Sequence, residues 1–211
     1  MTRGIFITFE GGEGAGKTTL IEEIYKLLLQ EGHQVYQTRE PGGTALGEEI
    51  RSLVLHKTAP VSPYAELALF LASRAQHLSE SIRPALKAGK IVLCDRFNDS
   101  TIAYQGMARG LGMEKVEAVC DFFCSGFNPD LTLYLDIDPE LGLTRAKKSR
   151  SADRIESEDI AFHTKIRNGY LAIHKKHPNR FHLLDATESP DGVFRRAVEI
   201  LQPFLSTQSS N

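Results

Sequence analysis

The stretch from residue 11 to residue 19 constrains the fold of this chain more than any other. It reads Gly-Gly-Glu-Gly-Ala-Gly-Lys-Thr-Thr and fits the pattern G-x-x-x-x-G-K-[S/T] without a mismatch. Glycines let successive backbone N–H groups curl around an anion, and a helix that begins near Gly16 adds its positive N-terminal end. Lys17 supplies a charge for the β- and γ-phosphates of a nucleotide, and Thr18 supplies a hydroxyl for Mg²⁺. We therefore expect a triphosphate site formed by Gly11, Gly12, Glu13, Gly14, Ala15, Gly16, Lys17, Thr18 and Thr19.

The segments on either side of this loop support the same interpretation. Residues 5–9 form a short run rich in β-forming residues, and apolar residues follow the loop at helical spacing. Strand, glycine loop and helix is the context that the motif requires, which favours a phosphate loop over a chance glycine-rich turn. The loop does not say what the triphosphate is used for.

Length and composition indicate one soluble globular domain over residues 1–211, with room for a mobile insertion. The net charge of −2 disfavours nucleic acid as a main partner. Cys94, Cys120 and Cys124 lie in apolar surroundings and are typical of reduced core residues in a cytoplasmic protein. The sequence contains no signal peptide and no run of 18 apolar residues, so we expect no membrane partner. Residues 206–211 form a polar tail.

Strand and helix patterns alternate along the chain. The expected strands are residues 4–10, 34–38, 91–94, 131–137 and 181–184. The expected helices are residues 17–30, a helix capped by Thr44, 63–87, 113–125, a helix that starts at residues 138–140, 157–177 and 190–205. This order predicts an α/β fold with a five-stranded parallel sheet and helices on both faces. Residues 100–110 are polar and contain glycine, and no helix is predicted there.

A second nucleotide signature ends the apolar run at residues 91–94. Asp95 follows this buried strand directly, as in the Walker B pattern. Its carboxylate can orient Mg²⁺ or the water shell of the ion. The predicted metal site therefore consists of Thr18 and Asp95, with Mg²⁺ as the cofactor.

Arginines near strand ends suggest a second anion site. Arg39, Arg51, Arg74 and Arg96 all fall at the ends of expected strands or on helices near them, and arginine binds phosphate through two hydrogen bonds. Any one of them could be an ordinary surface residue. Arg39 and Arg96 follow predicted strands directly, which puts them at the ligand crevice of an open α/β sheet.

Two facing anion sites favour a small-molecule kinase. A GTPase would need an Asn-Lys-x-Asp motif, which is absent, and a motor or DNA-handling ATPase is usually more basic.

Two features have both an ordinary and a functional interpretation. Phe70 and Arg74 share one face of the expected helix 63–87, where a ring can stack on a base and a guanidinium can donate to its carbonyl. Spacing alone favours a core Phe70 and a solvated Arg74. The basic residues between 145 and 154 are either a solvated helix end or a short mobile lid that closes over the triphosphate and excludes water.

With these residues in place, the chain resembles the thymidylate kinase family. The motifs that carry the resemblance are residues 9–19 (FEGGEGAGKTT), 39–44 (REPGGT), 95–97 (DRF), 103–106 (AYQG) and 153–156 (DRIE), in order and at the right spacing over about residues 3–205. The resemblance implies a P-loop NTPase three-layer fold and transfer of the γ-phosphoryl group of ATP to dTMP, giving dTDP on the route to dTTP. It also implies Mg²⁺ and a homodimer.

The resemblance assigns roles to matching positions. It implies that Phe70 stacks on thymine, that Arg74 donates to the thymine O4, and that Arg39 and Arg96 bind the dTMP phosphate. Thr101 lies near the base, Tyr104 crowds the 2′ position of the sugar, Gln105 lies near the same pocket, and Glu13 meets the 3′-hydroxyl. This reverses the interpretation of Phe70 and Arg74 that spacing alone favours.

The resemblance also points to the lid, expected at about residues 145–156. One style of the family carries a basic residue in the phosphate loop just after the acid, where this chain has Gly14. The missing charge then comes from the lid, in the bacterial-like arrangement. Arg150 is the first candidate, followed by Arg145, which would contact ATP, and Arg154. The expected catalytic residues are Lys17, Asp95, Arg96, Arg150 and Arg154. The alternatives are another (deoxy)nucleoside monophosphate kinase, a deoxynucleoside kinase, or a nucleotide-dependent switch or binding module.

Overall fold

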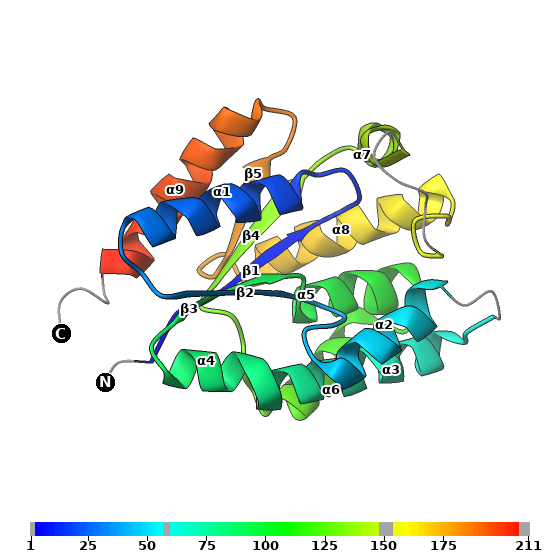
Figure 1. The fold of residues 1–211 in the computed structure, drawn as a ribbon. Helices are drawn as coiled ribbons and strands as arrows, with labels where there is room; N and C mark the ends of the chain where they lie inside the picture. Colours follow the sequence, from blue (N-terminus) through cyan, green and yellow to red (C-terminus); the bar gives the residue numbers. More distant parts are fainter. Residues whose placement is uncertain (1–2, 57–59, 148–153, 207–211) are drawn as a thin grey trace.

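The computed structural model describes residues 3–56, 60–147 and 154–206. Five parallel strands form one sheet with the order β2-β3-β1-β4-β5 (Figure 1). They are β1 (Phe6–Gly11), β2 (Val35–Arg39), β3 (Ile91–Asp95), β4 (Leu131–Asp136) and β5 (Phe181–Asp185). The predicted five-stranded parallel sheet is therefore confirmed.

Helices cover both faces of this sheet. The α-helices are α1 (Lys17–Gln30), α2 (Ala45–His56), α3 (Pro63–His77), α4 (Arg83–Lys87), α5 (Asn98–Thr101), α6 (Met113–Cys124), α7 (Pro139–Lys147), α8 (Ile160–Lys176) and α9 (Pro190–Ser206), and two π-helical segments are η1 (Leu78–Ile82) and η2 (Ile102–Ala108). In Figure 1, α1 and α9 lie side by side above the sheet, while α2, α3, α4 and α6 lie below it.

Strand residues alternate between the two layers. Ile7 and Phe9 of β1 pack with the apolar faces of α1 and α9, whereas Phe6 packs with η1 and α4. Tyr134 of β4 belongs to the cluster formed by α2, α3, η2, α6 and α8. Because both faces are buried, the strands read as continuous apolar runs in the sequence.

Capping residues end or begin two helices at the positions that the sequence predicts. Helix α1 spans the residues expected, and Gly32 follows it with φ +84°. Thr44 accepts a hydrogen bond from the N–H of Gly47 through its Oγ1 at 3.0 Å, so it caps α2 as predicted. The helix expected over 63–87 is continuous but passes through the π-helical turn η1.

The segment around residues 100–110 differs from expectation, because residues 98–108 are helical. Glycine serves close packing here. A Cβ on Gly106 would lie 3.0 Å from the Cα of Met113 on α6, and one on Gly169 of α8 would lie 3.0 Å from the Cα of Ala103. Polar residues of this segment, including Thr101 and Gln105, are buried. The polar residues of this segment therefore form a buried polar surface, and its glycine allows close contact with a neighbouring helix.

The topology brings three strand ends to one place. β1 lies next to β3, and β3 lies next to β2, with Asp95 level with both Phe9 and Arg39. The segments that follow these strands are therefore neighbours, although they lie far apart in the sequence. This edge is where ligands bind in open α/β folds.

Candidate active site

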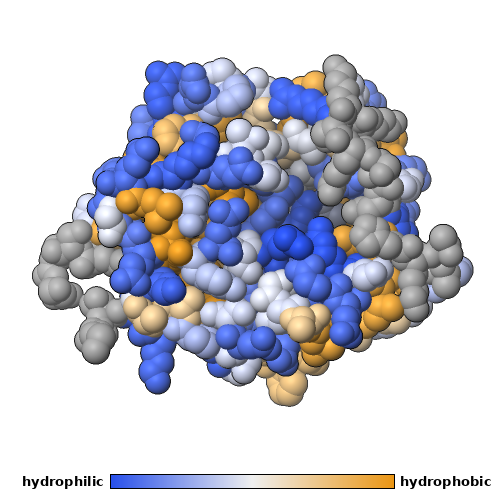
Figure 2. All heavy atoms as spheres, viewed as in Figure 1, coloured by the Kyte–Doolittle hydropathy of each residue, from blue (hydrophilic) through white to orange (hydrophobic). Residues whose placement is uncertain are grey.

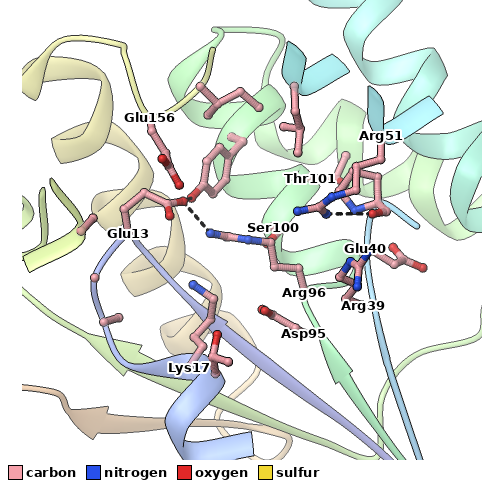
Figure 3. Close-up of a pocket in the computed structure, with 18 of the residues that line it drawn as sticks. Glu13, Lys17, Arg39, Glu40, Arg51, Asp95, Arg96, Ser100, Thr101 and Glu156 are labelled. Atoms are coloured by element: carbon pink, nitrogen blue, oxygen red, sulfur yellow. Dashed lines mark hydrogen bonds and ion pairs between the residues drawn. The ribbon is translucent and has the colours of Figure 1, made fainter. Parts of the chain in front are cut away.

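A cleft of about 690 Å³ opens at these strand ends. On the face drawn in Figure 2, hydrophilic residues gather around a recess in the middle of the molecule, and Figure 3 shows the side chains that line the cleft. Most predicted site residues line it: Glu13, Gly14, Ala15, Gly16, Lys17, Thr18, Thr19, Arg39, Phe70, Arg74, Asp95, Arg96, Thr101, Tyr104, Gln105 and Arg145. Gly11 and Gly12 are not among the lining residues, but their carbonyl groups contact Lys17.

The glycine loop forms one end of the cleft. Gly14 and Gly16 have φ values of +67° and +92°, which side chains rarely adopt, and Gly16 is the N-cap residue of α1. The Nζ of Lys17 donates to the carbonyl oxygens of Gly11 at 3.1 Å and Gly12 at 3.2 Å. Burial lowers the pKa of the Lys17 ammonium, and the positive charge of Arg96 lowers it further. The loop thus holds a desolvated cation at the start of a helix.

Arg96 lies near Lys17 in the cleft and extends toward Glu13 (Figure 3). Its Nη2 donates to Oε1 of Glu13 at 2.7 Å, and its guanidinium lies 5.1 Å from the centre of the Tyr104 ring. The Tyr104 hydroxyl donates to the same Glu13 oxygen at 3.4 Å. Arg96 has φ +70°, a left-handed backbone that is rare outside glycine and often found at functional sites. Glu13, Arg96 and Tyr104, predicted separately, therefore form one constellation.

Beneath Arg96 lies a buried carboxylate that the sequence analysis missed. Glu10 accepts from the Ser100 hydroxyl at 2.6 Å, the Tyr170 hydroxyl at 2.9 Å and the Phe97 N–H at 2.8 Å. Arg96 in turn donates to the Ser100 and Tyr170 oxygens at 3.3 and 3.4 Å. Burial, reinforced by the charge of Asp99, raises the pKa of Glu10 to about 7. Two hydroxyl groups thus connect Arg96 to this carboxylate.

Arg74 and Phe70 form another part of the cleft wall. Arg74 is 1% exposed, so the solvated interpretation favoured by spacing alone is wrong. Its Nε donates to Glu40 at 2.6 Å, its Nη1 donates to Thr101 Oγ1 at 2.9 Å, and its guanidinium lies 5.0 Å from the centre of the Phe97 ring. Phe70 is partly buried: it packs against the apolar cluster of α2, α3, η2, α6 and α8, and it also lines the cleft.

Arg39 lies at the end of β2, and Arg51 lies on the helix α2 that follows it. Arg39 ends β2 and donates to both carboxylate oxygens of Glu48 at 3.0 and 3.1 Å, with about half of its side chain exposed. Arg51 of α2 donates to the carbonyl of Pro41 at 2.9 Å and lines the cleft beside Arg39. On this side of the cleft, β2, α2, α3 and the loop after β3 therefore supply Arg39, Arg51, Arg74 and Arg96.

The two predicted metal ligands face the same cleft. Thr18 and Asp95 both line it, next to Lys17. Oδ1 of Asp95 is buried and has no hydrogen-bond partner among the described residues. A buried carboxylate oxygen without a donor is suited to a cation or to the water shell of one. The residues present therefore fit Mg²⁺.

The structure places the three arginines predicted for the lid differently. Arg145 lines the cleft and donates to the carbonyl of Ala186 at 2.9 Å. Arg154 is not among the lining residues, because its Nη2 donates to Glu66 at 2.5 Å and its Nε donates to the carbonyl of Val54 at 2.8 Å. The two residues after it, Ile155 and Glu156, do line the cleft. Arg150 lies outside the described residues.

Among the residues that sequence reasoning missed, Glu40 had a usable signal because it directly follows Arg39 in a motif. Glu66 and Tyr170 had none, since each lies far along the chain from every motif it contacts.

Among the helices in the described part of the chain, no helix is both long and apolar enough to cross a membrane.

The fold and the site define an α/β phosphotransferase of the P-loop class, with a phosphate loop after the central strand and arginines facing it. A family model described as thymidylate kinase matches residues 9–197. The thymidylate kinase of Protochlamydia amoebophila is 51% identical over 95% of this chain and 93% of its own length, and that of Clostridium novyi is 45% identical over 96% and 100%. The crystal structure of thymidylate kinase from Ehrlichia chaffeensis superposes with a TM-score of 0.78 at 34% identity, covering 95% of this chain and 99% of that one. This chain belongs to the thymidylate kinase family.

Proposed function

We propose that this protein transfers the γ-phosphoryl group of ATP to dTMP, giving ADP and dTDP for dTTP synthesis. The observation that carries the proposal is the single cleft that holds Lys17 and the glycine loop at one end and arginines from separate elements opposite them. Two facing cationic sites suit one phosphate donor and one phosphate acceptor. A switch or binding module would not need the second site.

We assign the donor side to the glycine loop. Residues 11–19 would hold the ATP phosphates through backbone N–H groups, Lys17 and the N-terminus of α1, with Arg145 beside them. Thr18 and Asp95 would hold Mg²⁺, whose charge would neutralise the β- and γ-phosphate oxygens. The unpartnered Oδ1 of Asp95 supports this assignment.

We assign the acceptor side to the opposite wall. Arg39 and Arg96 would bind the dTMP phosphate, Phe70 would stack on the base, and Arg74 would donate to its O4. Thr101 and Gln105 lie beside the base, while Glu13 and Tyr104 would meet the sugar. Their shared position on one cleft supports these roles, and the contact of Tyr104 with Glu13 supports a common sugar site.

The chemistry needs no strong general base, because a monophosphate is already anionic at neutral pH. Catalysis is then positioning and charge neutralisation. Lys17 and Arg96 would hold the two phosphates in line. The lid arginine, with Arg150 as first candidate, would neutralise the moving phosphoryl group and exclude water.

A coupled assay with ATP and a panel of acceptors tests the proposal. The panel contains dTMP, dUMP, UMP, AMP, GMP and thymidine. We expect dTMP to give the highest kcat/KM. Preference for another monophosphate, or for thymidine, would identify one of the alternative kinases. ATP turnover that does not depend on any acceptor would favour a switch.

We also propose a cytoplasmic homodimer in which α6 forms part of the interface. Val119, Phe122 and Phe123 are exposed on this helix, Phe122 by 80%. A contiguous exposed apolar surface of this kind is typical of protein–protein contacts. Sedimentation velocity should show a dimer, and Phe122→Glu should shift it toward monomer. A wild-type monomer at micromolar concentration would contradict the proposal.

A further inference from the structure

Glu66 of α3 is a buried carboxylate that sits beside the cleft but outside the predicted site. It is 1% exposed and accepts hydrogen bonds from three side chains. Gln105 of η2 donates its Nε2 to Oε1 at 2.8 Å, and Arg154 donates its Nη2 to Oε2 at 2.5 Å. Arg109 donates to both oxygens, at 3.2 and 3.3 Å. Gln105 is the one among these donors that lines the cleft.

Three hydrogen-bond donors, Gln105, Arg154 and Arg109, keep Glu66 ionised. Burial by itself would raise the pKa of this carboxyl, but the hydrogen bonds from Gln105, Arg154 and Arg109 outweigh burial and hold the pKa below its ordinary value. Glu158 balances the local charge by accepting from Arg109 Nη1 at 2.6 Å. An ionised carboxylate can only accept hydrogen bonds.

An acceptor-only neighbour determines which way an amide faces. The amide of Gln105 has a donor end and an acceptor end, and only the donor end can face Glu66 without two oxygens meeting. The carbonyl oxygen of the amide is then the end that remains to accept from a ligand. A ligand with a ring N–H on its hydrogen-bonding edge matches this arrangement. Thymine and uracil carry such an N–H at N3, whereas cytosine presents an acceptor there.

We propose that Glu66 is a positioning residue that fixes the amide orientation of Gln105 and thereby selects a pyrimidine with a ring N–H over cytosine. Arg109 and Arg154 support it by holding the carboxylate in place. Arg154 also precedes Ile155 and Glu156, which line the cleft, so the same carboxylate contacts both Gln105 and the first residue of the described segment 154–206. This inference rests on the proposed function, because it concerns the acceptor base.

The test compares kcat/KM for dTMP and dCMP in matched variants. Glu66→Gln keeps the size of the side chain but can donate as well as accept, so it releases the amide of Gln105. We expect the ratio of the two kcat/KM values to fall about tenfold, the effect of one mismatched hydrogen bond. A general loss of stability would lower both values and leave the ratio unchanged. Glu158→Gln removes a neighbouring carboxylate that does not touch Gln105, and it should leave the ratio unchanged.

A second variant keeps the proposal testable if Glu66→Gln folds poorly. Gln105→Leu removes the amide and should lower the ratio to the same extent. In the double variant, Glu66→Gln should cause no further fall, because both changes remove one shared interaction. An unchanged ratio in either single variant, or additive effects in the double variant, would overturn the role of Glu66. A wild-type enzyme that fails to phosphorylate dTMP would instead overturn the proposed function, so the two failures are distinguishable.

Discussion

Glu10 gives the protein a pH-dependent stability that can be measured directly. Its carboxyl is fully buried, and its pKa of about 7 lies well above the ordinary value of 4.5 that the unfolded chain would have. Between these two values the folded state keeps a proton that the unfolded state has lost. The free energy of unfolding must therefore decrease as pH rises through this range, and it levels off above the folded-state pKa.

The magnitude follows from the same two values. At about 1.4 kcal/mol for each pKa unit, ionising Glu10 in the folded protein costs roughly 3 kcal/mol in total. Part of this cost is already present at pH 5.5, because the unfolded carboxyl is mostly ionised there. About 2 kcal/mol should be lost between pH 5.5 and pH 8.5.

The perturbation that isolates this effect is Glu10→Gln. Glutamine can keep accepting from the Phe97 N–H, while the Ser100 and Tyr170 hydroxyls can turn to accept from its amide. The variant has no carboxyl to titrate, so its stability should rise relative to wild type by about 2 kcal/mol over this pH range. Any constant difference between the two proteins cancels in this comparison.

Urea denaturation followed by circular dichroism at several pH values measures the effect. Glu22→Gln, an exposed change on α1, is the matched control for losing one negative charge. A constant stability difference between wild type and Glu10→Gln from pH 5.5 to pH 8.5 would refute the reasoning. A gain in the stability of Glu10→Gln relative to wild type as pH falls would also refute it, because the sign would be reversed.

Three further predictions concern catalysis and binding. Lys17→Ala should lower kcat by at least about 10²-fold with the fold intact, as judged by circular dichroism; near-normal turnover would remove the loop lysine from the mechanism. Arg150→Ala should lower kcat by on the order of 10³ and affect the KM for dTMP much less, and a change confined to KM would reassign Arg150 to binding. Phe70→Ala should weaken dTMP binding in calorimetry by about 1–3 kcal/mol, the contribution of stacking on one base, and unchanged affinity would argue against stacking.

The fold could be predicted largely from local patterns. Each buried parallel strand produces an apolar run, and each amphipathic helix produces an apolar stripe, so their order along the chain defines the sheet type. The π-helical turn η1 and the helix over residues 98–108 escaped prediction. The second case arose because polarity and glycine indicate a turn locally, whereas here they serve a buried wall and close contacts with Met113 and with α8.

The site was predictable where its residues belong to sequence motifs. Lys17 begins the helix after β1, and Asp95 and Arg96 stand at the end of β3. Because β1 and β3 are neighbours in the sheet, the structure brings all three residues to one cleft. Arg74 was a different case, because spacing fixes the face of a helix but not what covers that face. Glu40, 34 residues earlier in the chain, accepts from Arg74 at 2.6 Å and makes its burial possible.

The sequence by itself therefore determined the phosphate loop, the parallel sheet and the family, since these depend on neighbouring residues and on the periods of helix and strand. Only the tertiary structure decided the partners that tune the site. Tyr170 reaches Glu10 across 160 positions of sequence, and Gln105 reaches Glu66 across 39. The charge of a buried carboxylate and the orientation of an amide depend on desolvation and on donors from other elements, which no local pattern specifies.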